Sequence, residues 1–199
     1  GVKLIRKVMQ ENDMFVIGTN AKKNYLKRLE RKKNILNREF DVSRPNEVWV
    51  SDVTEVYFQG KKMYLCVIID LYARKVVAYR VSNKNNTPLT KKTFDMAFKI
   101  REPKEKLLFH SDQGWQYQHA EYQRLLSEHN ITQSMSRKGN CMDNGAMENF
   151  FGRLKVEMFY GEKFESVNTF IDELKAYIDY YNNERISLKL KGMSPVQYR

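Results

Sequence analysis

The chain has 199 residues, of which 42% are hydrophobic and 13% aromatic, so it can build a core and is not globally disordered. Its 35 lysines and arginines outnumber 24 acidic residues, and the formal net charge of +11 favours a polyanionic partner, either nucleic acid or an acidic membrane surface. No apolar run approaches the ~20 residues that span a bilayer, and no signal-peptide pattern is visible, so no membrane insertion is expected.

The cysteines and histidines do not form a metal-binding pattern. Cys66 lies in an apolar run and Cys141 in a Gly/Asn-rich stretch, and neither has a Cys-x-x-Cys partner. His110, His119 and His129 lack the paired spacing of metal ligands. The sequence therefore predicts neither a disulfide framework nor a zinc module, and it favours a reducing, cytoplasmic location.

Residues 1–44 form a region distinct from the rest. Leu4–Met9 is typical of the last turns of a helix, and Ala21–Phe40 is densely basic with only a loose helical period. Two interpretations stay open for this basic helical arm: a solvated linker helix, or an arm that lies along DNA phosphates through residues such as Lys32 and Lys33. Pro45 marks the boundary to a core at 45–185, which a tail at 186–199 follows.

The core predicts a mixed sheet. Runs rich in Val, Ile, Tyr and Phe at 48–58, 63–70 and 75–82, joined by short turns, indicate an antiparallel meander. A helical stripe from Pro88 to Ile100 leads to a short strand at 107–111, and such a crossover places this strand parallel to one of the first three. The remaining expected elements are a helix at 121–129, a strand at 131–135, a loop at 136–145, a helix at 146–159, and a helix capped by Thr169 that ends near Asn183. This order predicts an α/β fold in which helices cover both faces of a five-stranded sheet.

Three acids stand where a carboxylate needs compensation. Asp52 lies inside the first strand, Asp112 ends the fourth, and Glu148 lies on a helix. If the first and fourth strands are neighbours, Asp52 and Asp112 meet where open α/β sheets bind ligands, and the helix of Glu148 closes the third side. Three crowded carboxylates repel one another, and two Mg²⁺ or Mn²⁺ ions would remove that conflict and activate a water or a 3′-hydroxyl.

Other acids keep alternatives open, because 24 acids allow many triples to be chosen. Asp70 is either a strand-end acid that fixes a hairpin turn or a rival to Asp52. Asp143, together with Asn144, is expected to cap the helix that bears Glu148.

Basic and aromatic side chains near the three acids are candidates for DNA contacts. Lys155 follows Glu148 by seven residues and returns to nearly the same helix face, where it could meet a phosphate. Trp115 and Tyr117 could stack on an unpaired base or could equally pack the sheet edge. The further basic candidates are Arg137, Lys138 and Arg153.

Several segments, in the same order, resemble bacterial insertion-sequence transposases with a retroviral-integrase-type core. The resemblance covers roughly residues 34–199 and rests on Asn34–Phe40, Pro45–Thr54, Ile69–Val77, His110–Gly114, Asp143–Glu148, Tyr181–Arg185 and Ser194–Tyr198. It implies an RNase H-like fold and a D-D-E triad at Asp52, Asp112 and Glu148, with 35 residues between the last two acids and two Mg²⁺ or Mn²⁺ ions per active site. It also implies that Lys155 is the basic residue of the family seven positions after the Glu.

The resemblance implies an activity and partners. Members of this branch nick transposon ends with water and join the freed 3′-OH to target DNA without a covalent protein intermediate. They act as homo-oligomers, at least dimers, on DNA, which predicts a bacterial cytoplasmic protein associated with the nucleoid. Leu4–Ile17 would be the remnant of their upstream DNA-binding region, and Ser187 departs from the family at a place where many relatives carry a histidine. The alternatives are a structure-selective nuclease of the same fold and a catalytically silent DNA-binding protein that descends from a transposase.

Overall fold

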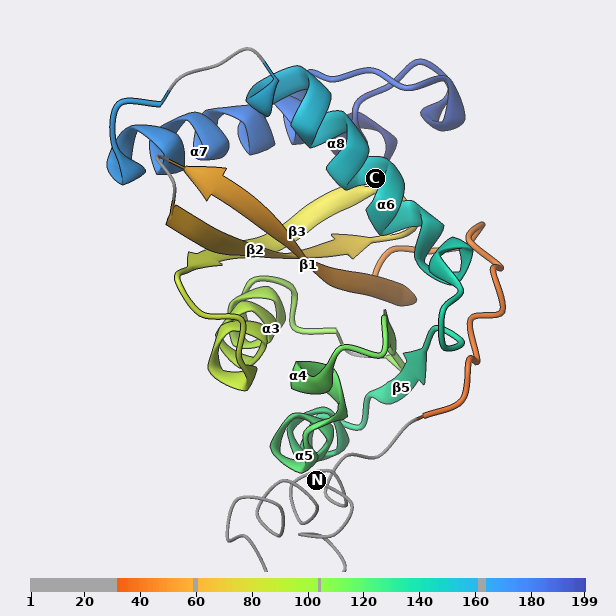
Figure 1. Ribbon diagram of the computed structural model, residues 1–199. Coiled ribbons are helices and arrows are strands. Elements are labelled where there is room, and N and C mark those ends of the chain that lie inside the picture. The colour runs from red at the N-terminus through yellow and green to blue at the C-terminus, as the bar shows by residue number, and fades with distance from the viewer. Residues whose placement is uncertain (1–31, 59–60, 104, 161–163) are drawn as a thin grey trace, which may run out of the picture. The chain divides into compact units, whose positions relative to one another are not determined.

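The computed structural model describes residues 32–58, 61–103, 105–160 and 164–199 (Figure 1). Contacts divide the chain into two compact units, 1–30 and 31–199, and the description below concerns the second. The predicted helix end at Leu4–Met9 and most of the predicted basic arm lie outside the described residues. Within the described ranges, no helix is long and apolar enough to cross a membrane.

Five strands form one mixed sheet in the order β3-β2-β1-β4-β5. The antiparallel meander is β1 (Val48–Phe58), β2 (Lys61–Asp70) and β3 (Lys75–Ser82). β4 (Leu108–Ser111) runs parallel to β1, and β5 (Thr132–Met135) runs parallel to β4. The predicted meander, the crossover and the mixed five-stranded sheet are confirmed.

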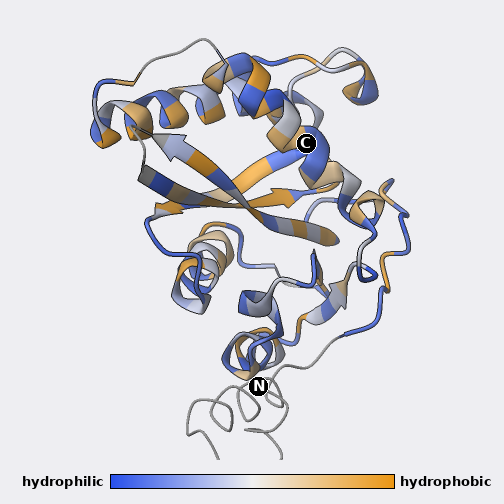
Figure 2. Cartoon of the chain, viewed as in Figure 1, coloured by the Kyte–Doolittle hydropathy of each residue, from blue (hydrophilic) through white to orange (hydrophobic). Residues whose placement is uncertain are grey.

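Helices cover both faces of this sheet, as predicted (Figure 1). On one face, α3 (Thr87–Arg101), α4 (Trp115–Gln118) and α5 (Ala120–Glu128) bury a cluster that includes Trp49, Phe94 and Phe109. On the other, α6 (Gly145–Leu154) and α7 (Val167–Asn183) bury a cluster that includes Val50 and Phe150. In Figure 2 the central strands are largely hydrophobic while the helices alternate, as elements with one buried face should.

The structure departs from the predicted elements in three places. α7 begins two residues before Thr169, because the Ser166 side chain accepts the Thr169 backbone N–H at 3.0 Å and is the actual N-cap. The helix expected at 146–159 is α helix only to Leu154 and continues as a π-helical turn, η2 (Lys155–Phe159). The stretch after Asp112 holds the short helix α4, which the sequence analysis did not predict.

The described part of the predicted arm packs on the core. Leu36 is buried in the α6 and α7 cluster, and the backbone N–H groups of Ile35 and Leu36 donate to Ser134 Oγ at 2.9 and 3.1 Å. Ser134 Oγ lies 2.8 Å from Nδ1 of the buried His110. Since that oxygen already accepts two N–H groups, its own proton points to Nδ1, so His110 is neutral and carries its proton on Nε2.

The tail also belongs to the folded unit. It contains η3 (Leu188–Leu190) and α8 (Pro195–Tyr198), with Leu190 buried. At its end, the Arg199 guanidinium lies 2.5 Å from Oδ2 of the fully buried Asp70. Asp70 also accepts the backbone N–H groups of Asn46 and Tyr72 at 3.0 and 3.2 Å. Asp70 therefore fixes the turn after β2 and binds the end of the chain. This agrees with the interpretation of Asp70 as a strand-end acid that fixes a turn.

Candidate active site

Asp52 lies on β1 and faces the layer that contains α6. Side chains alternate along a strand, and Val48, Val50 and Val56, which share the parity of Asp52, belong to the α6 and α7 cluster. The carboxylate is half-buried and accepts the Val53 N–H on Oδ1 at 2.7 Å. The Asp52 side chain therefore lies between the sheet and the helical layer, where it is only partly exposed to solvent.

Asp112 lies next to Asp52 by strand register. The parallel pairing of β1 with β4 ends at Ser51 and Ser111, so Asp52 and Asp112 each directly follow the last paired residue of two neighbouring strands. Asp112 is half-buried, and its Oδ1 accepts the Gly114 N–H at 2.9 Å. The pair therefore forms where β4 ends and β1 continues, which is the predicted arrangement.

The pKa of Asp52 depends on the charges of both other acids. Burial raises the pKa of Asp52 to about 7, and the negative charges of Asp112 and, to a lesser degree, Glu148 add to this effect. Burial also raises the pKa of Asp112, against the opposing hydrogen bond from Gly114. No basic side chain contributes to the pKa shift of either aspartate, so their negative charge is not neutralised by one.

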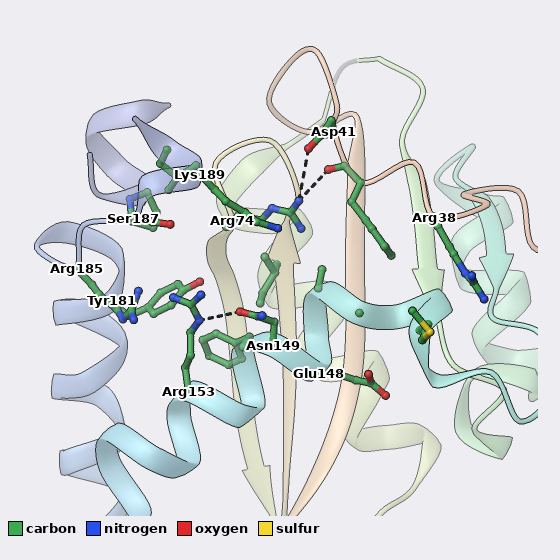
Figure 3. A pocket seen from close by; sticks show the side chains of 18 residues that line it. Arg38, Asp41, Arg74, Glu148, Asn149, Arg153, Tyr181, Arg185, Ser187 and Lys189 are labelled. Atoms are coloured by element: carbon green, nitrogen blue, oxygen red, sulfur yellow. Dashed lines mark hydrogen bonds and ion pairs between the residues drawn. The ribbon is translucent and has the colours of Figure 1, made fainter. Parts of the chain in front are cut away.

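Glu148 comes from the first turn of α6, on its exposed side. Figure 3 shows its carboxylate on the side of α6 that is near β1, away from Asn149 and Arg153. The start of α6 is tied to the same strand, because Asn144 Nδ2 donates to the Ser51 carbonyl at 3.4 Å. Glu148 thus lies close enough to Asp52 to act on its charge, on a helix that is tied to β1 one residue before Asp52.

Asp143 does not cap α6, which corrects the prediction. Its buried carboxylate instead binds two arginines: Arg38 Nε at 2.7 Å, and Arg137 Nε and Nη2 each at 2.8 Å. These bonds, those of Arg137 first, hold the pKa of Asp143 well below its usual range. Asn144 makes no side-chain cap hydrogen bond either. The two residues fix the loop before α6 to the segment at 38 and to β1.

The carboxylates fit hard divalent cations, although they are not gathered tightly. Among the described residues, no three Asp, Glu, His or Cys side chains already form a group that could hold a metal ion. Asp52 and Asp112 nevertheless offer adjacent oxygen ligands, and Glu148 acts on Asp52 electrostatically. The buried side-chain oxygens of Asn144 and Gln116 have no partner among the described residues, so they could accept hydrogen bonds from metal-bound waters.

Comparison with known proteins gives the family. The description "Integrase core domain" belongs to two family models, which match residues 42–141 and 148–199. The chain belongs to this integrase core family. InsK, described as a transposase of insertion sequence IS150 in Escherichia coli K12, is 49% identical over 83% of this chain and 59% of its own length. A transposase-like protein of Haemophilus influenzae is 47% identical over 83% of this chain and 76% of its own length.

A solved structure supports the fold. The HTLV-2 integrase catalytic core domain in complex with magnesium matches 77% of this chain and 96% of its own length, with 18% identity and a TM-score of 0.62. The predicted RNase H-like fold and the resemblance to insertion-sequence transposases are thereby confirmed. This chain spans about 59% of the length of InsK.

The aromatic candidates of this integrase core separate in the structure. Tyr117 is fully buried, and its hydroxyl lies 2.9 Å from Ser51 Oγ, so it packs behind the sheet and cannot stack on a base in this conformation. The packing interpretation therefore holds for Tyr117. Trp115 remains 39% exposed at the start of α4, three residues after Asp112.

The basic candidates also occupy different places. Arg137 is engaged with Asp143, whereas Lys138 is exposed on the following position. Lys155 is half-buried at the first position of η2. Lys33 is exposed, and its carbonyl accepts the Met135 N–H at 3.2 Å, which places this segment along β5; Lys32 precedes it.

Sequence reasoning missed a groove beside Glu148. Its lining includes Arg38, Arg74, Tyr181, Arg185 and Lys189, which come from four separate segments. The motif around Tyr181–Arg185 was the available signal, but only the fold brings it to α6.

Proposed function

We propose that this integrase core is the catalytic region of a DNA transposase that cuts transposon ends with water and joins the freed 3′-OH to target DNA. The observation that carries the proposal is that Asp52 and Asp112 directly follow the last paired residues of β1 and β4, and that the negative charge of Glu148 acts on Asp52. The 49% identity to InsK supports DNA ends as the substrate class.

Asp52, Asp112 and Glu148 would hold two Mg²⁺ or Mn²⁺ ions. The HTLV-2 core was solved with magnesium, and carboxylates are the ligands that these cations prefer. When bound, the ions would polarise the scissile phosphate and lower the pKa of the attacking hydroxyl. Asp52 must release its proton to serve as a ligand, since its pKa is raised to about 7.

The remaining roles concern DNA and assembly. Lys155 would contact a phosphate near the scissile bond from the start of η2, and Lys138, Arg153 and Trp115 would contact the flanking strand. Arg137 would act indirectly, because it holds Asp143 and so fixes the loop before α6. Lys32 and Lys33 would lie along the backbone further away. The HTLV-2 core is described in a trimeric form, and we infer that this protein also acts as an oligomer, associated with the bacterial nucleoid.

The test is to incubate the full chain with labelled element ends and Mg²⁺ and to map cut and joined strands. Asp52→Asn, Asp112→Asn and Glu148→Gln should each reduce cutting and joining to background while DNA binding persists. Products that are cut but never joined would make the protein a nuclease. Near-wild-type cutting by any of the three variants would remove that residue from the catalytic site.

A further inference from the structure

The groove beside Glu148 is a cavity of about 440 Å³. It lies between α6, the segment at 38–41, the end of α7 and the tail (Figure 3). Five cationic side chains and two carboxylates line it; the cations are Arg38, Arg74, Arg153, Arg185 and Lys189, and the acids are Asp41 and Glu148. Ion pairs already engage Arg38 with Asp143, Arg185 with Glu157 and Arg74 with Asp41, so Arg153 and Lys189 carry the positive charge that remains to attract an anion.

Three of the arginines converge on one phenol. Tyr181 is 8% exposed at the wall of the groove. Burial raises the pKa of its hydroxyl, and the positive charges of Arg153, Arg185 and Arg74 oppose that rise. Figure 3 shows the Arg153 guanidinium beside the Tyr181 ring, with Arg185, Ser187 and Lys189 around them. Guanidinium groups repel each other, so their convergence favours an anion between them.

The arginines differ in how far they are already satisfied. Arg185 makes three hydrogen bonds with the Glu157 carboxylate, at 2.7, 2.9 and 3.1 Å, so it joins α7 to η2. Arg74 donates to the Phe40 carbonyl at 3.1 Å. These two arginines therefore shape the groove while contributing positive charge to it.

Arg153 and Lys189 keep donors available. Arg153 Nε donates to Asn149 Oδ1 at 2.7 Å, which orients the guanidinium along α6. Among the described residues, its two terminal nitrogens and the Lys189 ammonium make no hydrogen bond or ion pair, while the charge of Arg153 acts on Glu157 and Tyr181. A planar guanidinium that presents two parallel N–H groups matches the geometry of two phosphate oxygens.

The position of Arg153 relative to Glu148 indicates the occupant. At about 100° per residue, Lys155, the first residue of η2, lies roughly 20° from Glu148 around the helix axis, whereas Arg153 lies roughly 140° away, so the two basic residues belong to separate surfaces. Arg153 is also about 7.5 Å further along the helix axis, the axial rise of about two nucleotide steps in B-DNA. Glu148 and Arg153 both line the groove, so a strand that passes Glu148 and continues into the groove brings a phosphate close to Arg153.

We propose that this groove binds a phosphate group and that its occupant is a phosphodiester of the DNA strand that continues past Glu148, held by Arg153 and Lys189. The inference rests on the proposed function in taking DNA as the ligand. It adds a second contact surface on α6, separate from the face of Lys155 and formed with the tail.

Binding without catalysis tests this inference. DNA titrations are made by fluorescence anisotropy with labelled single-stranded and duplex DNA, in EDTA, on the full chain carrying Glu148→Gln. Adding Arg153→Gln or Lys189→Gln should each weaken DNA binding about five- to tenfold at 0.1 M salt and lower the slope of log K against log salt by about 0.9. Arg124→Gln is the matched control: this arginine of α5 also pairs with a side chain one turn away, Glu128, but it does not line the groove. Its affinity and slope should stay at the parent values.

Inorganic phosphate identifies the source of the bound group. At matched ionic strength, millimolar phosphate should displace DNA no better than chloride. Phosphate that binds the parent protein but not the groove variants, while DNA binds all of them equally, would make the occupant a free anion and overturn the strand assignment. DNA affinity and slope unchanged in both variants would also overturn it. That result would leave the D-D-E assignment intact, whereas normal groove binding without any Mg²⁺-dependent cutting would contradict the proposed function alone.

Discussion

Gly114 tests how the site holds Asp112. A Cβ at this position would lie 2.9 Å from Asp112 Oδ1 and 2.5 Å from Gln116 Nε2, whereas ordinary contacts begin at 3.4 Å. The backbone φ of −56° is one that any residue adopts, so Gly114→Ala acts through this crowding and not through backbone strain. An alanine would therefore displace the end of the Gln116 side chain and crowd the Asp112 carboxylate.

The size of the effect follows from these distances. To restore ordinary contact, the Asp112 carboxylate must move by about 0.5 Å. Since a 1 Å misplacement can cost about 10²-fold in rate, Gly114→Ala should slow Mg²⁺-dependent cutting about tenfold. Crowding of this kind costs about 1–3 kcal/mol of stability, so the protein should still fold.

The assay is the rate of cutting of a labelled element end as a function of Mg²⁺ concentration. Gly152→Ala on α6 is the control, because a Cβ there meets nothing within 4 Å and should leave the rate unchanged. A Gly114→Ala protein with the wild-type rate at every Mg²⁺ concentration would show that the position of Asp112 does not limit the reaction.

Three further predictions follow from the buried groups. Because the pKa of Asp52 is raised to about 7, the apparent Mg²⁺ affinity should fall as the pH falls from 8 to 6. Without metal, ionisation of Asp52 lowers the stability of the fold by up to about 4 kcal/mol as the pH rises from 3.8 to 7. Asp52→Asn should therefore raise the Tm at pH 8. Burial lowers the pKa of His110 to about 4 from its usual 6.5, so the fold should lose up to about 3 kcal/mol as the pH falls through that interval, and His110→Gln should flatten the dependence of Tm on pH. Tyr117→Phe should cost about 1 kcal/mol through the lost hydrogen bond to Ser51 and leave DNA affinity unchanged.

Each of these has a contradicting result. Metal titrations that do not depend on pH between 6 and 8 would place the proton elsewhere than on Asp52. A Tm that falls equally with pH in wild type and His110→Gln would assign acid sensitivity to other groups. A loss of DNA affinity in Tyr117→Phe, at a Tm close to wild type, would mean that the ring leaves its buried position to contact DNA.

Much of the fold was predictable because it depends on local patterns. The alternation of Val48, Val50 and Asp52, and the short apolar strand before Asp112, determine which side chains share a face and where a strand ends. Local patterns failed at the start of α7, where Ser166 and Thr169 are both good N-cap residues and only the backbone decides between them.

The site was less predictable where partners are distant in sequence. Asp143 was expected to serve its own helix but binds Arg38, 105 residues away. The helical period places Lys155 on the face of Glu148, but it does not show that Arg153 lines a groove with residues of the tail. The groove itself depends on the tail folding back beside α6, which no local pattern encodes.

The central claim is that three carboxylates from β1, the end of β4 and α6 come together around two cations. Crystals of the full chain with a DNA end, soaked in Mn²⁺, would test it through anomalous scattering. The account predicts two Mn²⁺ peaks about 3.5–4 Å apart, with oxygens of Asp52, Asp112 and Glu148 as their protein ligands. Mn²⁺ bound elsewhere, or bound by the aspartates without Glu148 among the ligands, would contradict it.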